Sequence, residues 1–175
     1  MADLDDDDGP ALPVGQPNYM TLTSFNALQA EALQYIDVER PEFTRLVNWA
    51  ASNGDRSENA DYHYGKKRLR EIDRRIGYIQ RRLKLAVVVN PAEQTQRSRV
   101  FFGATVTYVL PDGTDKTIEI VGIDEADVAR GKVSFIAPVA RAMLGKTVGD
   151  EAVLHLPEGK IIIEIDAVSY PDTHK

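Results

Sequence analysis

The spacing of five apolar residues in the first half of the chain restricts its fold most strongly. They follow one another at intervals of three, four, three and four positions, at Leu69, Ile72, Ile76, Ile79 and Leu83. This heptad pattern places all five side chains on one face of an α-helix and predicts a coiled-coil seam. We therefore expect a second helix that packs against it.

The partner helix is expected earlier in the chain, beginning at an N-cap at Thr23 or Ser24. Its buried edge follows nearly the same spacing, at Phe25, Ala32, Ile36, Phe43, Leu46 and Ala50. Pro41 lies inside this stretch and should kink the helix or mark a local break, because proline removes one backbone hydrogen bond.

The two helical stretches are joined by a few residues around Asn53 and Gly54. Residues 19–90 are therefore predicted to form an antiparallel coiled-coil hairpin with an acidic tip. Each arm would extend roughly 45 Å at the rise of an α-helix. Trp49 is expected to be a packing residue near the end of the hairpin.

The second half of the chain is rich in alternating and turn-forming sequence, which is typical of a small β-rich domain. A polar linker over residues 91–98 leads into a domain over residues 99–175. A short helix is expected at 138–144, with strands at 100–110, 117–123, 132–136, 151–156 and 161–168. The predicted fold class is α+β, with an antiparallel sheet beside the helical hairpin.

Composition excludes several classes of protein. The chain has no cysteine, so disulfides and thiolate metal sites are excluded. No run approaches the roughly 18 apolar residues of a membrane helix, and the acidic N-terminus lacks a signal-peptide pattern. We expect a soluble cytoplasmic protein. Residues 1–18 are predicted to be a disordered acidic tail, because they cannot bury enough apolar surface to offset the entropy lost on ordering. The run from Asp5 to Asp8 lacks the spacing of a calcium loop.

A basic band interrupts an otherwise acidic chain. The net charge of −6 argues against a general nucleic-acid-binding protein. From Lys66 to Lys84, however, there are nine basic residues and only two acidic ones, Glu71 and Asp73. Coiled coils also carry charge on their outer faces for solubility, but few acids are placed to pair with this band. Contact with phosphate or RNA is the favoured interpretation.

Three carboxylates lie where the two helices are joined. Asp55 and Glu58 are three residues apart, and Asp61 follows them. Asp55 and Glu58 could share Mg²⁺, which proteins commonly hold with one or two carboxylates plus water and phosphate oxygens. Two carboxylates make an incomplete site, so the ion would be shared with a partner. Spacing alone favours the alternative of a capping box, in which Asp55 caps the second helix and Glu58 bonds back to its amide.

A resemblance to a known family is carried by residues 49–83, WAASNGDRSENADYHYGKKRLREIDRRIGYIQRRL. This stretch resembles the hairpin of the Gre transcript-cleavage factors, and closely that of their GreB branch. The segments VFFGATVTY, IVGIDEAD, ARAMLGKTVGDEAV and PEGKIIIEIDAV resemble the family's FKBP-like C-terminal domain. One departure is Ala137, which stands where the family's SPxARALLGK motif has serine and could weaken a helix cap.

This resemblance implies a protein that binds bacterial RNA polymerase and is not itself an enzyme. The domain at 99–175 would dock near the secondary channel, and the hairpin would reach the active site and stimulate cleavage of backtracked RNA. Carried over by position, Asp55 would support Mg²⁺ shared with the polymerase, and Glu58 would position water or tune the metal. The supporting tip residues would be Arg56, Ser57, Asn59, Asp61 and Tyr62.

The resemblance also implies two binding surfaces on a protein expected to be a monomer without a tightly bound cofactor. The nascent RNA 3′ end would contact Lys66, Lys67, Arg68, Arg70, Arg74, Arg75, Arg81 and Arg82. The polymerase would contact Pro138, Arg141, Leu144, Gly145, Gly149 and Asp150.

Two other functions stay open. Some Gre homologues bind the channel and modulate or inhibit the polymerase without promoting cleavage, although the intact acidic tip counts against this. The FKBP-like domain could be a peptidyl-prolyl isomerase, but fold does not carry function. Aromatic residues such as Phe102, Tyr108, Phe135 and Tyr170 would line a proline pocket only thinly.

Overall fold

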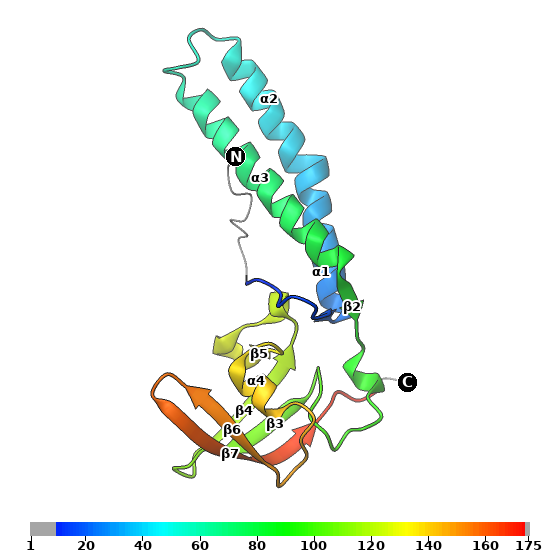
Figure 1. Cartoon of the computed structure of the whole chain (residues 1–175). Helices are drawn as coiled ribbons and strands as arrows, with labels where there is room; N and C mark the ends of the chain where they lie inside the picture. The colour runs from blue at the N-terminus through cyan, green and yellow to red at the C-terminus, as the bar shows by residue number, and fades with distance from the viewer. Residues whose placement is uncertain (1–9, 174–175) are drawn as a thin grey trace. The chain divides into compact units, whose positions relative to one another are not determined.

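The computed structural model describes residues 10–173 (Figure 1) and divides the chain into two compact units. The hairpin unit contains residues 25–86 and the segment that ends at Gln16. The sheet unit contains residues 17–24 and the chain from Val87 onward. The first unit thus ends at residue 86, earlier than the expected boundary at residue 90. The run from Asp5 to Asp8 lies outside the described residues.

The hairpin unit consists of antiparallel helices, as predicted (Figure 1). One arm is formed by α1 (Leu22–Gln34), the π-helical turn η1 (Tyr35–Glu39) and α2 (Arg40–Ala51). The other arm is α3 (Ala60–Lys84). The hydroxyl of Thr21 accepts a hydrogen bond from the N–H of Ser24 at 3.2 Å. Thr21, and not Thr23 or Ser24, therefore caps α1.

The π-helical turn lies just before Pro41, where the sequence indicated a kink or a break. The N–H of Arg40 bonds to the carbonyl of Tyr35, five residues back, so the turn contains one residue more than an α-helical turn. The extra residue turns Tyr35 and Glu39 towards α3 and leaves Ile36 39% exposed. Ile36 was therefore wrongly assigned to the buried edge, because an uninterrupted α-helical spacing does not allow for this widening.

The two arms pack most closely through their small and branched residues. Ile72 and Ile79 of the predicted seam are fully buried on α3, and Ala50 is fully buried on α2. Gly65 is also buried, and a Cβ atom built on it would lie 2.6 Å from a methyl group of Val47. A larger residue at this position would push α2 and α3 apart.

The sheet unit begins earlier than the expected domain. The strand β1 (Asn18–Met20) pairs with β2 (Ala86–Val88) in a two-stranded sheet, and Asn18 is fully buried. Residue 18 therefore belongs to a strand and not to a disordered tail. The expected linker contains a short 3₁₀ turn, η2 (Pro91–Glu93), in which the side chain of Asn90 accepts a hydrogen bond from Ala92.

A five-stranded sheet with order β5-β4-β3-β7-β6 forms most of the sheet unit. Its strands are β3 (Thr105–Val109), β4 (Asp115–Val121), β5 (Lys132–Ser134), β6 (Glu151–Leu156) and β7 (Gly159–Ser169). The α+β class is confirmed, but the expectation of an antiparallel sheet was wrong for one pair. β4 and β5 are parallel, because the 3₁₀ turns η3 (Ile123–Glu125) and η4 (Val128–Arg130) lie between them.

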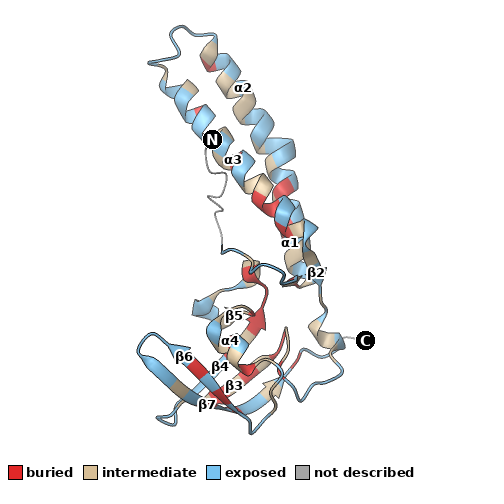
Figure 2. Cartoon of the chain, viewed as in Figure 1, coloured by how far each residue is buried: buried red, intermediate tan, exposed pale blue. Residues whose placement is uncertain are grey.

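The short helix α4 (Pro138–Met143) lies within the sheet unit and contacts β6. Its N-cap residue is Ala137, which makes no side-chain cap hydrogen bond, as expected from the missing serine. Figure 2 shows buried residues on β3 and β7 and in the middle of the hairpin, whereas the loop between α2 and α3 is exposed. Among residues 10–173, no helix is long and apolar enough to cross a membrane.

Candidate functional site

Residues 52–59, which we call the tip loop, connect α2 to α3 and are closed by Asn59. The side chain of Asn59 accepts a hydrogen bond from the N–H of Tyr62 at 3.0 Å and thereby caps α3. The same side chain donates a hydrogen bond to the carbonyl of Ala50 at 2.8 Å. Asn59 therefore holds the beginning of α3 and the last turn of α2 together.

Asp55 is exposed and has one carboxylate oxygen engaged within the loop. This Oδ1 atom accepts hydrogen bonds from the backbone N–H of Ser57 at 2.9 Å and from its hydroxyl at 2.8 Å. These bonds favour the charged form and lower the pKa of Asp55 below its usual value. The carboxylate is therefore ionised and oriented at neutral pH, and its Oδ2 atom makes no hydrogen bond with a described residue.

Glu58 is exposed, and within residues 10–173 its carboxylate makes no hydrogen bond or ion pair. The capping box expected from spacing alone was wrong, because α3 begins at Ala60 and is capped by Asn59. Asp55 and Glu58 are therefore not used to begin the helix. Carboxylates suit a hard cation such as Mg²⁺. The described part of the chain contains no cluster of three metal-binding side chains, so these two would need ligands from a partner.

The remaining tip residues surround Tyr62. Its ring lies beneath two cations, with the guanidinium of Arg56 6.0 Å and the ammonium of Lys66 5.4 Å from the ring centre. The Nε2 atom of His63 lies 3.1 Å from the carbonyl oxygen of Ser57, and this hydrogen bond further restrains the loop. Asp61 lies in the first turn of α3, where its negative charge is favourable at a helix N-terminus.

Two cations of the predicted RNA-binding band pair with acids of the opposite arm. Arg75 bonds to both carboxylate oxygens of Glu31, at 2.7 and 3.0 Å. Arg68 pairs with Glu39 at 2.9 Å and with Glu71 at 3.3 Å. Few acids were expected to pair with the band, and these two cations are the exceptions among the ion pairs of the described residues. Sequence inspection missed Glu31 and Glu39 because they lie more than 25 residues before their partners and become neighbours only when the hairpin closes.

Arg82 is also turned inward and is only 5% exposed. It donates hydrogen bonds to the hydroxyl of Tyr78 at 2.9 Å and to the carbonyl of Pro10 at 2.8 Å. Arg68, Arg75 and Arg82 are seven residues apart and therefore share one face of α3. These contacts give the row a role in the stability of the hairpin.

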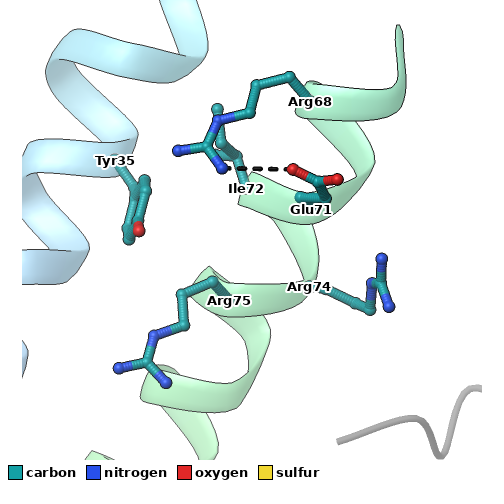
Figure 3. Close-up of a pocket in the computed structure, with 6 residues that line it drawn as sticks. All are labelled: Tyr35, Arg68, Glu71, Ile72, Arg74 and Arg75. Carbon is teal, nitrogen blue, oxygen red and sulfur yellow. Dashed lines mark hydrogen bonds and ion pairs between the residues drawn. The ribbon is translucent and has the colours of Figure 1, made fainter. Parts of the chain in front are cut away.

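A second row of cations on α3 is exposed. Figure 3 shows Arg74 extending away from Tyr35, whereas Arg68 and Arg75 extend towards the helix that carries Tyr35. Tyr35 and the three arginines line a hollow of about 380 Å³. Glu71 lines it as well, so one carboxylate offsets part of the positive charge. Five predicted RNA-binding cations are exposed, namely Lys66, Lys67, Arg70, Arg74 and Arg81. Among these, Lys67, Arg70 and Arg74 make no ion pair with any described residue.

The six predicted docking residues are divided between two hollows and a turn. Pro138 and Arg141 line a hollow of about 310 Å³ together with Ile136, Ala142, Val153 and His155. Gly149 and Asp150 instead shape a turn. The carboxylate of Asp150 accepts hydrogen bonds from the N–H and hydroxyl of Thr147 at 2.8 and 3.1 Å. These bonds lower the pKa of Asp150.

Leu144 and Gly145 belong to a separate aromatic pocket of about 440 Å³. Its other lining residues are Tyr19, Gln94, Phe101, Phe102 and Phe135. The expectation of a thin aromatic lining was wrong for this pocket, because Phe101 was not counted and Tyr19 comes from β1, outside the expected domain. Its ring centre is 5.9 Å from that of Phe102 and 5.5 Å from that of Phe135.

Comparison with known proteins identifies the class to which this fold and site belong. Residues 18–88 match the family described as "Transcription elongation factor, N-terminal", and residues 94–170 match "Transcription elongation factor, GreA/GreB, C-term". The chain therefore belongs to the GreA/GreB family of transcription elongation factors.

Within this family the chain is GreB-like. It is 52% identical to transcription elongation factor GreB of Neisseria meningitidis serogroup B over 153 residues, covering 87% of this chain and 94% of the relative. It is 43% identical to GreB of Pasteurella multocida over 157 residues, covering 90% and 99%. A solved structure of GreA factor homolog 1 from Thermus thermophilus is 22% identical, with a TM-score of 0.41, and covers 87% of this chain and 99% of that one.

Proposed function

We propose that this Gre factor enters the secondary channel of bacterial RNA polymerase and stimulates the polymerase's own cleavage of backtracked RNA. The observation that carries the proposal is the exposed pair Asp55 and Glu58 on the tip loop, neither of which caps α3. Because these two carboxylates form an incomplete metal site, they suit a magnesium ion shared with the polymerase.

The chain contributes to the reaction by positioning the two negatively charged carboxylates of Asp55 and Glu58. Ser57 orients the carboxylate of Asp55, which is ionised at neutral pH, and its hydrogen bonds lower the pKa of Asp55 further. Glu58 is free to accept a hydrogen bond from the attacking water or to approach the metal. A second metal ion in such a site stabilises the entering and leaving oxygens of phosphodiester hydrolysis. Asn59 acts as a positioning residue, because it fixes both ends of the loop.

The RNA 3′ end is proposed to contact the exposed cations of α3, chiefly Lys67, Arg70 and Arg74. Cations three and four residues apart on one helix face can neutralise successive phosphates of a single strand. Lys66 and Arg81 lie on the exposed part of the same helix and complete this surface.

The sheet unit is proposed to be an FKBP-like domain that docks on the polymerase, and the hairpin to be a coiled coil. The hollow beside Pro138 and Arg141 offers apolar side chains together with a cation, which suits a protein partner. We further infer a monomer that acts in the cytoplasm, where the polymerase is found.

The proposal is tested with stalled, backtracked polymerase complexes and transcript sizing. We expect Asp55→Asn and Glu58→Gln each to slow cleavage by about 100-fold at saturating protein, the loss typical of a key electrostatic group. Asp37→Asn removes an exposed acid from η1 and serves as the matched control, with cleavage unchanged. Full activity in the Asp55→Asn, Glu58→Gln double variant would refute the metal-supporting role.

The aromatic pocket favours one further candidate function, that of a peptidyl-prolyl isomerase. The assay is isomerisation of a model X-Pro peptide by the whole chain, with Phe102→Ala as the matched variant.

The same transcript-sizing assay also tests a modulator that binds the channel. Arrested polymerase without shortened transcripts would identify a protein that binds the channel and does not stimulate cleavage.

A further inference from the structure

Trp49, the only tryptophan of the chain, is exposed where packing was expected. It lies in the last turn of α2, and 58% of its surface is accessible. Within residues 10–173 its indole makes no ring contact and has no cation above it. Tyr64 is similarly exposed at 59%, but its ring packs edge-on against Phe43 at 5.9 Å between centres. An indole left in water forgoes the stabilisation of burial, so Trp49 is better explained by a partner than by the fold.

Arg45 lies one helical turn before Trp49 on the same exposed side of α2. It makes no ion pair with a described residue, unlike Arg40 on the same helix, which bonds to Asp73 at 2.7 Å. The two side chains therefore present an aromatic face and a cation roughly 6 Å apart along the helix axis. This combination suits a single nucleic-acid strand, whose unpaired bases stack on aromatic rings and whose phosphates attract guanidinium groups.

We propose that Trp49 and Arg45 form a second RNA contact, on α2, in which the indole stacks on an unpaired base and the guanidinium contacts a neighbouring phosphate. This inference rests on the proposed function, because Trp49 lies only a few residues before Asp55 and Glu58. This contact differs from the one proposed for the exposed cations of α3, Lys67, Arg70 and Arg74, which would recognise only the charge of phosphates. It positions the displaced RNA beside the tip loop, and it tolerates any base because every base has a π face.

The contact is tested by removing each side of the stack separately. Backtracked complexes are prepared with natural bases or with abasic residues throughout the displaced 3′ segment. With natural bases, Trp49→Ala should raise the protein concentration for half-maximal cleavage about tenfold, as expected for one lost stack. With abasic RNA the same substitution should have no effect. The maximal cleavage rate should be unchanged on both RNAs, which separates this contact from Asp55 and Glu58.

Matched variants distinguish the possible partners. Trp49→Phe keeps an aromatic face and should restore most of the binding, while Leu33→Ala, at an apolar residue 52% exposed on α1, should change nothing. Thermal unfolding checks that each variant is folded. An equal effect of Trp49→Ala on natural and abasic RNA would show that the indole contacts polymerase protein and would overturn the proposal, as would no effect on either RNA.

Fluorescence separates this inference from the proposed function. If the wild-type chain failed to stimulate cleavage, the proposed function would fail by itself. The emission of Trp49 can still be followed while a single-stranded oligoribonucleotide is added to the chain alone, because no other tryptophan interferes. Quenching that is weakened by Arg45→Ala supports the contact. Unchanged emission at saturating RNA would contradict it.

Discussion

Different interactions stabilise the tip loop and the rest of the hairpin, which we call the shaft (residues 22–51 and 60–84). The shaft buries Ile72, Ile79 and Ala50 and adds ion pairs between the two arms. The tip loop contributes no fully buried side chain. It is held by hydrogen bonds that Asp55 accepts from Ser57, and by those that Asn59 accepts from Tyr62 and donates to Ala50. Substitutions in the shaft should therefore change stability, whereas substitutions of tip carboxylates should change chemistry and leave the shaft folded.

The same contrast separates residues of one type on α3. Arg75 and Arg74 are adjacent in sequence, yet Arg75 belongs to the packed side of the helix and Arg74 to the exposed side (Figure 3). Adjacent residues on an α-helix are about 100° apart, so a basic run necessarily divides between an inner and an outer face. Counting cations in the sequence therefore overestimates how many are exposed to a ligand.

Asn59 belongs to both regions, and its substitution should give the largest effect of the three that follow. Asn59→Ala removes the cap of α3 and the bond to Ala50. It should lower the free energy of unfolding by about 1 kcal/mol and slow cleavage about tenfold, because the loop is no longer held. Asn59→Asp keeps an acceptor for the N–H of Tyr62 and loses only the donor to Ala50.

We expect Asn59→Asp to unfold in urea like the wild type and still to cleave more slowly. Urea unfolding and the cleavage rate at saturating protein measure the two effects independently. Wild-type cleavage by Asn59→Asp would mean that the bond to Ala50 does not position the tip.

Arg75 and Arg74 provide a matched pair for the contrast between inner and outer cations. Arg75→Ala should lower the free energy of unfolding by about 0.5–1 kcal/mol, since its ion pair with Glu31 is about two-thirds shielded from solvent. Arg74→Ala should change stability by less than about 0.5 kcal/mol. It should instead weaken binding to backtracked complexes and reduce the salt dependence by about one phosphate contact.

Glu31→Ala is the control for this pair, because it should destabilise the hairpin as Arg75→Ala does. The opposite pattern, in which Arg75→Ala alters the salt dependence and Arg74→Ala alters stability, would reverse the assignment of the two rows.

The smallest expected effect is the change in the pKa of Asp55 that follows substitution of Ser57. Ser57→Ala removes the hydroxyl donor and leaves the backbone donor, so the pKa of Asp55 should rise part of the way to its usual 3.8. Because folding lowers this pKa, the stabilisation is present above pH 3.8 and is lost as the pH falls through the folded-state pKa. A carboxyl NMR titration measures the shift, with Ser52→Ala as the control. An unchanged pKa would mean that the hydroxyl bond is not formed in solution.

Much of the fold follows from local patterns. The strand Glu151–Leu156 has the limits that alternation predicted. The helix begins at Pro138 as predicted and ends at Met143, one residue before the expected end. The strand expected at 100–110 is shorter, because the chain turns at Gly103, whose φ is +82°, before β3 begins. The parallel pairing of β4 and β5 was not predicted, since strand direction depends on how the turns between them cross the sheet.

The heptad seam, the turn at Asn53 and Gly54, and the two tip carboxylates could be read from spacing because each depends on residues close together in the chain. The cap at Asn59, the pairing of Arg68 and Arg75, and the exposure of Trp49 depend on how the two arms align. The π-helical turn shifts that alignment by one residue. Such a shift leaves the local pattern of apolar residues nearly unchanged but decides which side chains meet across the hairpin, and only the folded structure contains it.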